Sequence, residues 1–291
     1  MQGAPEIMKC LSLGDAEIEY CEHGRGEPLL LVHAGVFADW FFPMATSETL
    51  NGFRIIRVRR AGYGPNAPKR PLTLQDHASH LWTLSQVLDI KTLHLVGHSS
   101  GGLIGLQLAS DHPELVRSLI LLEPAPCGPL QASAFAEIGE RFVGPAMAAL
   151  AAGNLEGAFD TFMRGVCGDA HREVIEQSLG KPGYEQAVRE SRFFFHDEVP
   201  AAMQWRFGAD EAARIRQPVL IVEGGEGRKN GLLSQQVTEL AMTLLPQAEF
   251  AMIEGVNHLM PLQNPDAVGL VIAGYARRHS ILSAGAGQAM A

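Results

Sequence analysis

A five-residue segment in the first half of the chain has the residue types and spacing needed for nucleophilic catalysis. Residues 97–101 read Gly-His-Ser-Ser-Gly and fit the pattern G-x-S-x-G centred on Ser99. The pattern does not fit Ser100, because position 98 is His rather than Gly. A strand-like run precedes the segment and a helix-like run follows it, and a serine in such a sharp turn projects its hydroxyl at the carboxyl edge of a sheet. The segment therefore predicts that Ser99 is a nucleophile that attacks an acyl carbon.

The attacked carbonyl oxygen gains negative charge and needs hydrogen-bond donors. The backbone N–H of Ser100 is expected at a helix N-terminus, where N–H groups lack intrahelical partners and favour an anion. A second donor is expected in the loop after residues 27–33, where Gly35 lets the backbone approach a bound carbonyl, with Val36 as the neighbouring alternative. We predict an oxyanion hole formed by the backbone N–H groups of Gly35 and Ser100. His33 is expected to pack within the loop rather than to act as a base.

Alternating strand-like and helix-like runs must position these residues. Short apolar runs at 27–35, 53–58, 92–99, 117–124, 218–225 and 248–255 are apolar on both faces, which is typical of buried parallel strands. Helix-like runs at 74–90, 101–115, 233–245 and 265–279 lie between and after them, and residues 7–13 and 16–24 resemble an antiparallel hairpin. The order predicts the α/β class with a doubly wound, mostly parallel sheet, whose ligands bind at the carboxyl ends of the strands.

Residues 127–213 interrupt this rhythm with a helix-like composition rich in Ala, Phe, Met and Glu. We predict a helical cap inserted between core strands, with the core formed by residues 1–126 and 214–291. The segment carries 7 Lys and Arg against 13 Asp and Glu, so it favours neutral rather than anionic substrates. Several large apolar residues are candidates either to line a pocket or to pack the cap on the core: Met147, Phe159, Phe162, Met163, Met203 and residues 193–195.

The bulk composition excludes several other classes of protein. A net charge of −9 argues against nucleic-acid binding, and no run of about 18 apolar residues is present to span a membrane. The first residues have no apolar run of signal-peptide length, so we expect a cytoplasmic protein; a homodimer is left open. The four cysteines show no CxxC spacing and are expected as reduced thiols.

No cofactor is expected. No P-loop, dinucleotide fingerprint or HExxH motif occurs, so neither a nucleotide nor zinc is implied. His77 and His80, with Asp76, form a weak metal pattern, for which a solvated helix face is the favoured interpretation.

The order of these motifs resembles the α/β-hydrolase superfamily, over about residues 16–279. The resemblance rests on the strand with its HAG loop, the GHSSG turn, the cap insertion and a late segment containing Gly255, His258, Pro261 and Pro265. It implies the α/β-hydrolase fold and His258 as the general base.

The position of the third catalytic residue departs from the family pattern. The family usually carries its acid where this chain has Gly227. Some members, haloalkane dehalogenases and certain lactone hydrolases among them, instead carry a Glu at the end of the preceding strand, and Glu123 stands there. Glu123 is the preferred triad acid, while Glu226 is the alternative acid and Glu223 stays open.

A second departure lies in residues 59–66. They keep the glycines of the family's D-x-R-G-x-G-x-S loop and lose its Asp, Arg and Ser. That loop is usually structural in the family, so its change bears little on catalysis.

Together these features predict a cofactor-free serine hydrolase. Its substrate is expected to be a small, neutral, apolar ester or lactone, cleaved through a Ser-His-Glu triad and an acyl-enzyme. A C–C bond hydrolase of diketo acids and a ligand-binding protein without turnover remain as alternatives. Ser100→Ala is expected to be mild and Ser99→Ala severe, because only the amide of Ser100 is assigned a role.

Overall fold

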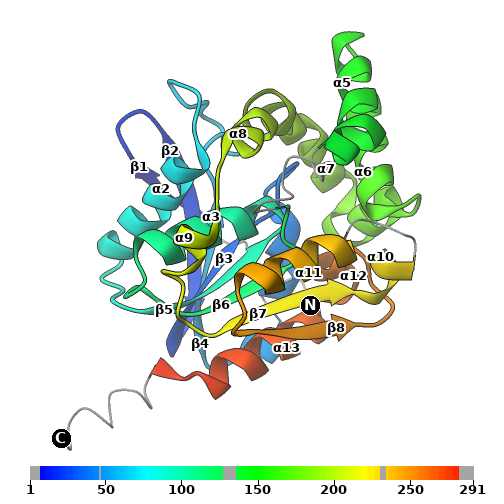
Figure 1. The fold of residues 1–291 in the computed structure, drawn as a ribbon. Helices are drawn as coiled ribbons and strands as arrows, with labels where there is room; N and C mark the ends of the chain where they lie inside the picture. The colour runs from blue at the N-terminus through cyan, green and yellow to red at the C-terminus, as the bar shows by residue number, and fades with distance from the viewer. Residues whose placement is uncertain (1–6, 46, 127–135, 230–233, 282–291) are drawn as a thin grey trace, which may run out of the picture.

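An eight-stranded, mostly parallel β-sheet forms the centre of the computed structural model, which describes residues 7–45, 47–126, 136–229 and 234–281 (Figure 1). The strands are β1 (Lys9–Ser12), β2 (Glu17–Gly24), β3 (Glu27–Val32), β4 (Phe53–Arg59), β5 (Leu93–His98), β6 (Val116–Leu122), β7 (Val219–Gly224) and β8 (Ala248–Ile253). Their order is β1-β2-β4-β3-β5-β6-β7-β8; β2 pairs antiparallel with both β1 and β4, and the other pairs are parallel. The predicted mostly parallel sheet and N-terminal hairpin are therefore confirmed. The expectation that residues 248–255 form a strand buried on both faces is wrong, because β8 lies at the edge of the sheet and Ile253 is its one buried residue.

The register of the central strands brings their carboxyl ends to one edge of the sheet. Val32 of β3 pairs with Gly97 of β5, and the last residue of β5 pairs with Leu122 of β6. Leu122 in turn pairs with Val222 of β7. Because neighbouring parallel strands end together, the residues that follow them are expected to lie close in space.

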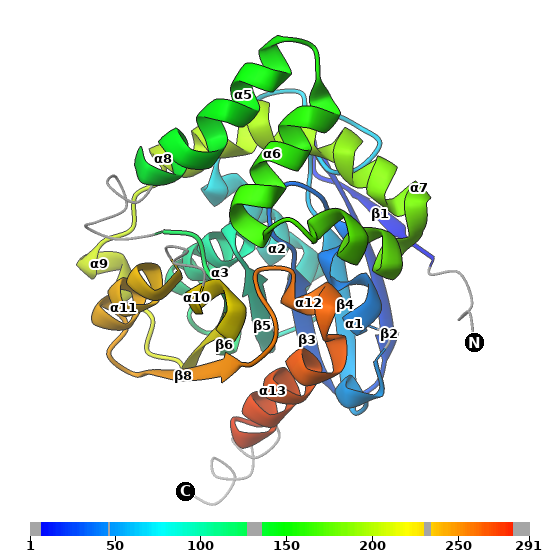
Figure 2. The ribbon, with the colours of Figure 1, turned by 90° about the vertical axis from the view of Figure 1, so that its right-hand side faces the viewer.

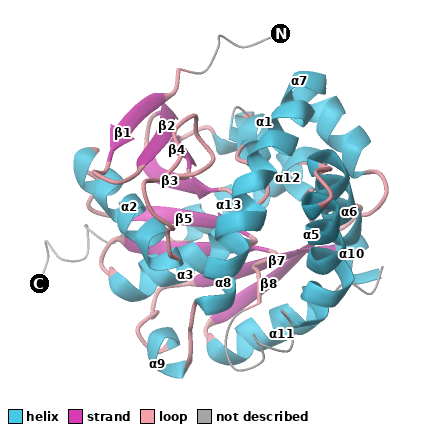
Figure 3. Cartoon of the chain, turned by 90° about the horizontal axis from the view of Figure 1, so that it is seen from above, coloured by secondary structure: helices cyan, strands magenta, loops and turns pink. Residues whose placement is uncertain are grey.

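Helices cover both faces of the sheet (Figure 3). One face packs against α2 (Leu74–Val87), α3 (Ser100–Asp111), α9 (Ala209–Ala212) and α11 (Ser234–Leu244). The other packs against α1 (Phe42–Ala45), α12 (Met260–Gln263) and α13 (Pro265–Arg278). A short helix, α10 (Gly225–Lys229), follows β7 directly. Each face of the buried strands thus has its own apolar cluster, which explains why their sequences are apolar throughout.

Four further helices lie between β6 and β7 in sequence, and we call them the inserted helices. They are α5 (Gly144–Ala151), α6 (Leu155–Cys167), α7 (His171–Phe193) and α8 (Val199–Gln204). They gather at one end of the sheet (Figure 2), and α7 is kinked at Gly180, whose φ is 74°. Two π-helical turns accompany them: Gly139–Val143 leads directly into α5, and Phe194–Glu198 joins α7 to α8.

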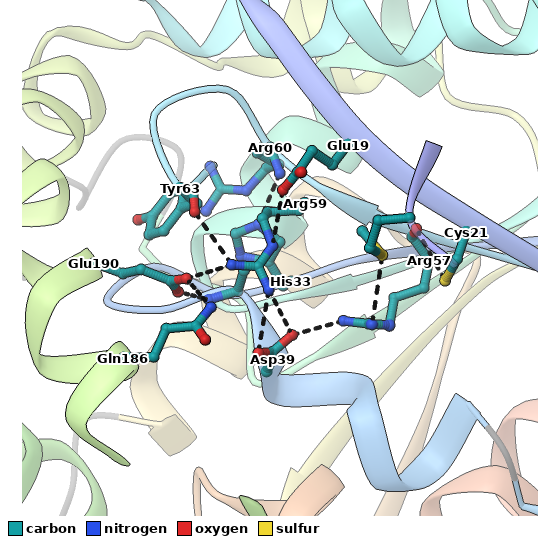
Figure 4. Close-up of polar contacts among 12 residues, drawn as sticks. Glu19, Cys21, His33, Asp39, Arg57, Arg59, Arg60, Tyr63, Gln186 and Glu190 are labelled. Carbon is teal, nitrogen blue, oxygen red and sulfur yellow. Dashed lines mark hydrogen bonds and ion pairs between the residues drawn. The ribbon is translucent and has the colours of Figure 1, made fainter. Parts of the chain in front are cut away.

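A glutamate of α7 attaches the inserted helices to the core (Figure 4). Glu190 accepts a hydrogen bond of 2.7 Å from the backbone N–H of Ala38 and pairs with Arg59 of β4. Arg59 also contacts Asp39 at 3.2 Å, so the cation lies between a carboxylate of the core and one of α7. Burial raises the pKa of Glu190, which the charge of Arg59 opposes. The bond to Ala38 ties α7 to the loop that follows β3.

The expectation of a solvated face at His77 and His80 is wrong. The two residues are only 2% and 8% exposed, and Phe193 of α7 packs against His77 with ring centroids 6.4 Å apart. Burial lowers the pKa of both histidines. Among the described residues, no cluster of three or more His, Cys, Asp or Glu side chains is arranged to hold a metal ion.

Two other sequence-based expectations can be compared with the structure. None of the helices in the described ranges is long and apolar enough to cross a membrane. Of the described cysteines, Cys10, Cys21 and Cys167 form no disulfide bond, while Cys127 lies outside the described residues.

Candidate active site

The turn between β5 and α3 holds Ser99 in a strained conformation. Its φ and ψ are 53° and −119°, which few residues other than glycine adopt. A Cβ atom on Gly97 would lie 2.5 Å from the carbonyl oxygen of Gly101, and a Cβ on Gly101 would lie 2.4 Å from that of Val32. Both flanking glycines are therefore sterically required. The turn presents Ser99 to a cavity at the carboxyl edge of the sheet.

His258 lines the same cavity and is held by Glu123. Its Nδ1 lies 2.7 Å from Oε2 of Glu123, while Oε1 accepts a 2.8 Å hydrogen bond from the backbone N–H of Gly224. Glu123 is 7% exposed and follows the last residue of β6 with a φ of 37°. Both carboxylate oxygens thus have a fixed donor. A neutral His258 that donates its Nδ1–H to Glu123 carries its free lone pair on Nε2, as a general base requires.

The alternative acid, Glu226, lies in the first turn of α10. Its backbone N–H donates a 2.9 Å hydrogen bond to the carbonyl of Val256, and the residue is half-buried. Glu123, in contrast, contacts the imidazole of His258 directly, with Oε2 2.7 Å from Nδ1.

Two aromatic residues pack around His258. The ring of His98 lies 4.6 Å from that of His258, and Trp40 approaches the same ring at 5.9 Å. Burial lowers the pKa of His98 well below its usual range, so His98 adds no positive charge beside His258. The indole N–H of Trp40 donates a 2.9 Å hydrogen bond to the carbonyl of Gly35. Trp40 was not predicted, because no motif distinguishes it from a core aromatic residue.

The loop after β3 and the start of α3 lie on the cavity with Ser99. Gly35 and Ser100 both line it, as does Val36, whose φ of 74° is another left-handed conformation. Ser100 is the first residue of the 12-residue helix α3, so its N–H has no intrahelical acceptor. A Cβ atom on Gly35 would lie 2.5 Å from the ring of Phe194, so this position has no room for a side chain. His33, in contrast, is fully buried: its Nδ1 donates a 2.6 Å hydrogen bond to the carbonyl of Ala34 in the same loop, and its Nε2 accepts a 3.1 Å bond from the backbone N–H of Arg60, which follows β4.

The cavity of about 180 Å³ is large compared with the ~10–15 Å³ that a single water molecule needs. Its lining is largely apolar. More than half of the apolar lining residues come from the inserted helices and their flanking turns: Ile138, Phe142, Val143, Phe162, Met163, Val166, Phe194, Val199, Ala202 and Met203. Of the residues that line it in the described part of the chain, none is Lys or Arg. The carboxylates on its wall are Glu123 and Glu198.

The apolar residues singled out in the sequence divide between lining and packing. Phe162, Met163, Phe194 and Met203 line the cavity. Phe159 and Phe195 are buried in the cluster that joins the inserted helices to the loop after β3, and Met147 packs at its edge.

Comparison with known proteins places this geometry in context. Residues 29–269 match the model of the alpha/beta hydrolase family. The chain is 26% identical, over 84% of its length and 96% of the relative, to pimeloyl-[acyl-carrier protein] methyl ester esterase of Aromatoleum aromaticum. It is 31% identical to 2-hydroxymuconate semialdehyde hydrolase of a Pseudomonas species, over 43% of this chain and 46% of that one.

A solved structure shares the fold. The enol-lactonase of Burkholderia xenovorans superposes with a TM-score of 0.76 at 17% identity, over 92% of this chain and all of that one.

Proposed function

Because the chain belongs to the alpha/beta hydrolase family, we propose that it hydrolyses neutral carboxylic esters or lactones with Ser99 as its nucleophile. The observation that carries the proposal is the 2.7 Å contact between His258 and Glu123 on the wall of the cavity that Ser99 also lines. Residues 127–213, which contain the inserted helices, act as a cap. This cap supplies the apolar side of the cavity. No cofactor takes part in this chemistry.

In the proposed reaction, His258 removes the hydroxyl proton of Ser99 through Nε2 while Ser99 attacks the acyl carbon. Glu123 holds the imidazole in the required tautomer and stabilises the imidazolium that forms. The backbone N–H groups of Gly35 and Ser100 bind the oxyanion of the tetrahedral intermediate. His258 then protonates the leaving alcohol, and a water molecule repeats the cycle on the acyl-enzyme.

The charge and polarity of the cavity favour a neutral substrate. Its lining is largely apolar and, among the described lining residues, offers no Lys or Arg to pair with a substrate carboxylate. Transfer of an unpaired carboxylate into such a site is costly. A relative named as a methyl ester esterase, similar over most of both chains, supports ester cleavage.

Cleavage of C–C bonds in diketo acids is the alternative function. The partial similarity to 2-hydroxymuconate semialdehyde hydrolase favours it, since the same nucleophile and base would serve. Diketo acids are anionic, however, and the lining residues described above give them no cationic partner.

A substrate panel with matched serine variants tests the proposal. The purified protein is assayed with p-nitrophenyl butyrate, a γ-lactone and a vinylogous diketo acid. We expect turnover of the first two, lost in Ser99→Ala by about 10³-fold or more. Ser110→Ala is the control. Ser110 is a buried serine near the end of α3, and its hydroxyl donates a hydrogen bond to the carbonyl of Glu211, away from the cavity. Turnover of the diketo acid alone would contradict the proposal, as would an active Ser99→Ala variant.

A further inference from the structure

Besides Glu123, the cavity is lined by Glu198, a glutamate of the inserted segment that lies beside the expected oxyanion hole. Glu198 ends the π-helical turn Phe194–Glu198 and is 1% exposed, although it lines the cavity. A carboxylate at this place is unfavourable on its own, because the reaction develops a second negative charge nearby. Its contacts therefore need an explanation.

Protein donors occupy both oxygens of Glu198. Oε1 accepts hydrogen bonds from the hydroxyl of Ser100 and, at 3.1 Å, from Nη2 of Arg60. Oε2 accepts a 2.5 Å bond from the hydroxyl of Tyr63 and lies 3.0 Å from the same Arg60 nitrogen. Burial and the charge of Glu198 raise the pKa of Tyr63 well above its usual range, so the phenol stays a donor. A carboxylate with its acceptor positions filled in this way is poorly placed to bind an ammonium group of a substrate.

Arg60 connects this carboxylate to the other side of the oxyanion hole. Its Nη2 also donates a 3.1 Å hydrogen bond to the carbonyl of Ala34, the residue before Gly35. Arg60 is 1% exposed and its guanidinium lies over the ring of Tyr63 at 4.9 Å (Figure 4 shows both residues). A Cβ atom on Gly35 would lie 3.1 Å from Oε1 of Glu198, so the carboxylate is adjacent to the loop itself.

We propose that Glu198 and Arg60 are positioning residues that hold the two oxyanion-donating backbone segments together. Glu198 fixes the start of α3 through the Ser100 hydroxyl, and Arg60 fixes the loop after β3 through the Ala34 carbonyl. Arg60 also neutralises Glu198, so that the carboxylate does not repel the oxyanion. This inference rests on the proposed function, because it assumes that the oxyanion forms between Gly35 and Ser100.

The charge-neutralising part of the proposal predicts an unequal response to the two single substitutions. Arg60→Met leaves an uncompensated carboxylate beside the oxyanion, whereas Glu198→Gln keeps an acceptor for Ser100 and removes the negative charge. The double variant removes both charges. We expect the rate of phosphonylation of Ser99 by a fluorophosphonate probe to fall about 10-fold to 100-fold in Arg60→Met and less in Glu198→Gln. The double variant should recover part of the loss of Arg60→Met.

A reversible transition-state analogue separates positioning from general stability. A short alkyl boronic acid forms a tetrahedral adduct with Ser99, and its inhibition constant should rise in parallel with the loss of kcat/KM while KM for the ester stays unchanged. Glu190→Gln is the matched control, since Glu190 is also a largely buried glutamate of the inserted segment but pairs with the neighbouring Arg59 and accepts from Ala38. It should leave the boronate constant within about threefold of wild type, although it also loosens the inserted helices.

If Arg60→Met does not fold, the inference is tested with Glu198→Gln and Ser100→Ala instead. Ser100→Ala removes only the hydroxyl that bonds Glu198 and should slow phosphonylation by about threefold to tenfold, with a modest fall in Tm because the buried carboxylate loses one donor. Equal phosphonylation rates in wild type and all folded variants would overturn this inference and leave the proposed function standing. A wild-type protein that does not react with the probe would instead contradict the proposed serine chemistry, and with it this inference.

Discussion

Replacing Glu123 by Gln should disable the general base without disturbing the shape of the site. In the structure one carboxylate oxygen accepts from the N–H of Gly224 at 2.8 Å and the other contacts Nδ1 of His258 at 2.7 Å. A glutamine has one acceptor oxygen and one NH₂ group, so it can serve only one of these two donors. With its oxygen toward Gly224, the NH₂ group faces Nδ1 and selects the tautomer whose Nε2 carries the proton. That His258 cannot accept the proton of Ser99.

Serine-protease triads indicate the size of the effect. Loss of tautomer control by the equivalent amide substitution costs about 10⁴ in kcat there. The same factor here corresponds to about 5 kcal/mol of transition-state stabilisation. We expect a fall in kcat of this order for p-nitrophenyl butyrate, with KM nearly unchanged, because the cavity wall keeps its shape.

Steady-state kinetics at pH 7.5 on Glu123→Gln and Glu226→Gln measure this difference, with Tm as the check on folding. The kcat of Glu226→Gln should stay within about threefold of the wild-type value, as expected for a half-buried residue outside the proposed triad. An active Glu123→Gln beside an inactive Glu226→Gln would refute the assignment of the acid.

Three further predictions concern the turn, the cavity and the pH dependence of stability. Gly101→Ala should lower the free energy of unfolding by about 1–3 kcal/mol in urea denaturation, because its Cβ would lie 2.4 Å from the carbonyl oxygen of Val32; wild-type stability would contradict this. Phe142→Ala should raise KM for a hexanoyl ester by roughly tenfold through lost apolar contact and leave KM for the acetyl ester alone; equal effects on the two esters would argue against a role in binding the acyl chain. Burial holds the pKa of His77 and His98 well below the unfolded value, so the unfolded chain binds more protons below about pH 6.5. The free energy of unfolding should therefore fall by roughly 3 kcal/mol from these two groups between pH 7.5 and 5.5, and urea denaturation that shows no fall would refute their burial as neutral rings.

The strand ends were predictable because their signals are local. Apolar runs specify buried parallel strands, and the residues directly after them must meet at one edge of the sheet. Ser99 and Glu123 follow β5 and β6 in this way, and the structure brings Glu123 to the ring of His258. The contact between Glu123 and His258 could therefore be anticipated, although the usual family position of the acid holds Gly227.

Contacts between distant segments were not predictable in the same way. Glu198 meets Ser100 and Arg60 across separations of 98 and 138 residues, and no periodicity in the sequence connects a π-helical turn to those positions. The burial of His77 was missed for the same reason, since the ring that covers it belongs to Phe193 of the inserted helices. Helix amphipathicity reports only that a face is apolar or polar, and says nothing of an element that arrives from elsewhere in the chain.

Peptide mapping of a covalent fluorophosphonate adduct tests most directly whether Ser99 is the nucleophile and depends on Glu123. The protein is treated with a fluorophosphonate, digested, and sequenced by tandem mass spectrometry across residues 97–102, where two serines are adjacent. We expect one adduct, on Ser99, and a strongly reduced rate of its formation in Glu123→Gln. An adduct on Ser100, or an adduct on Ser99 that forms equally fast without the Glu123 carboxylate, would contradict this expectation.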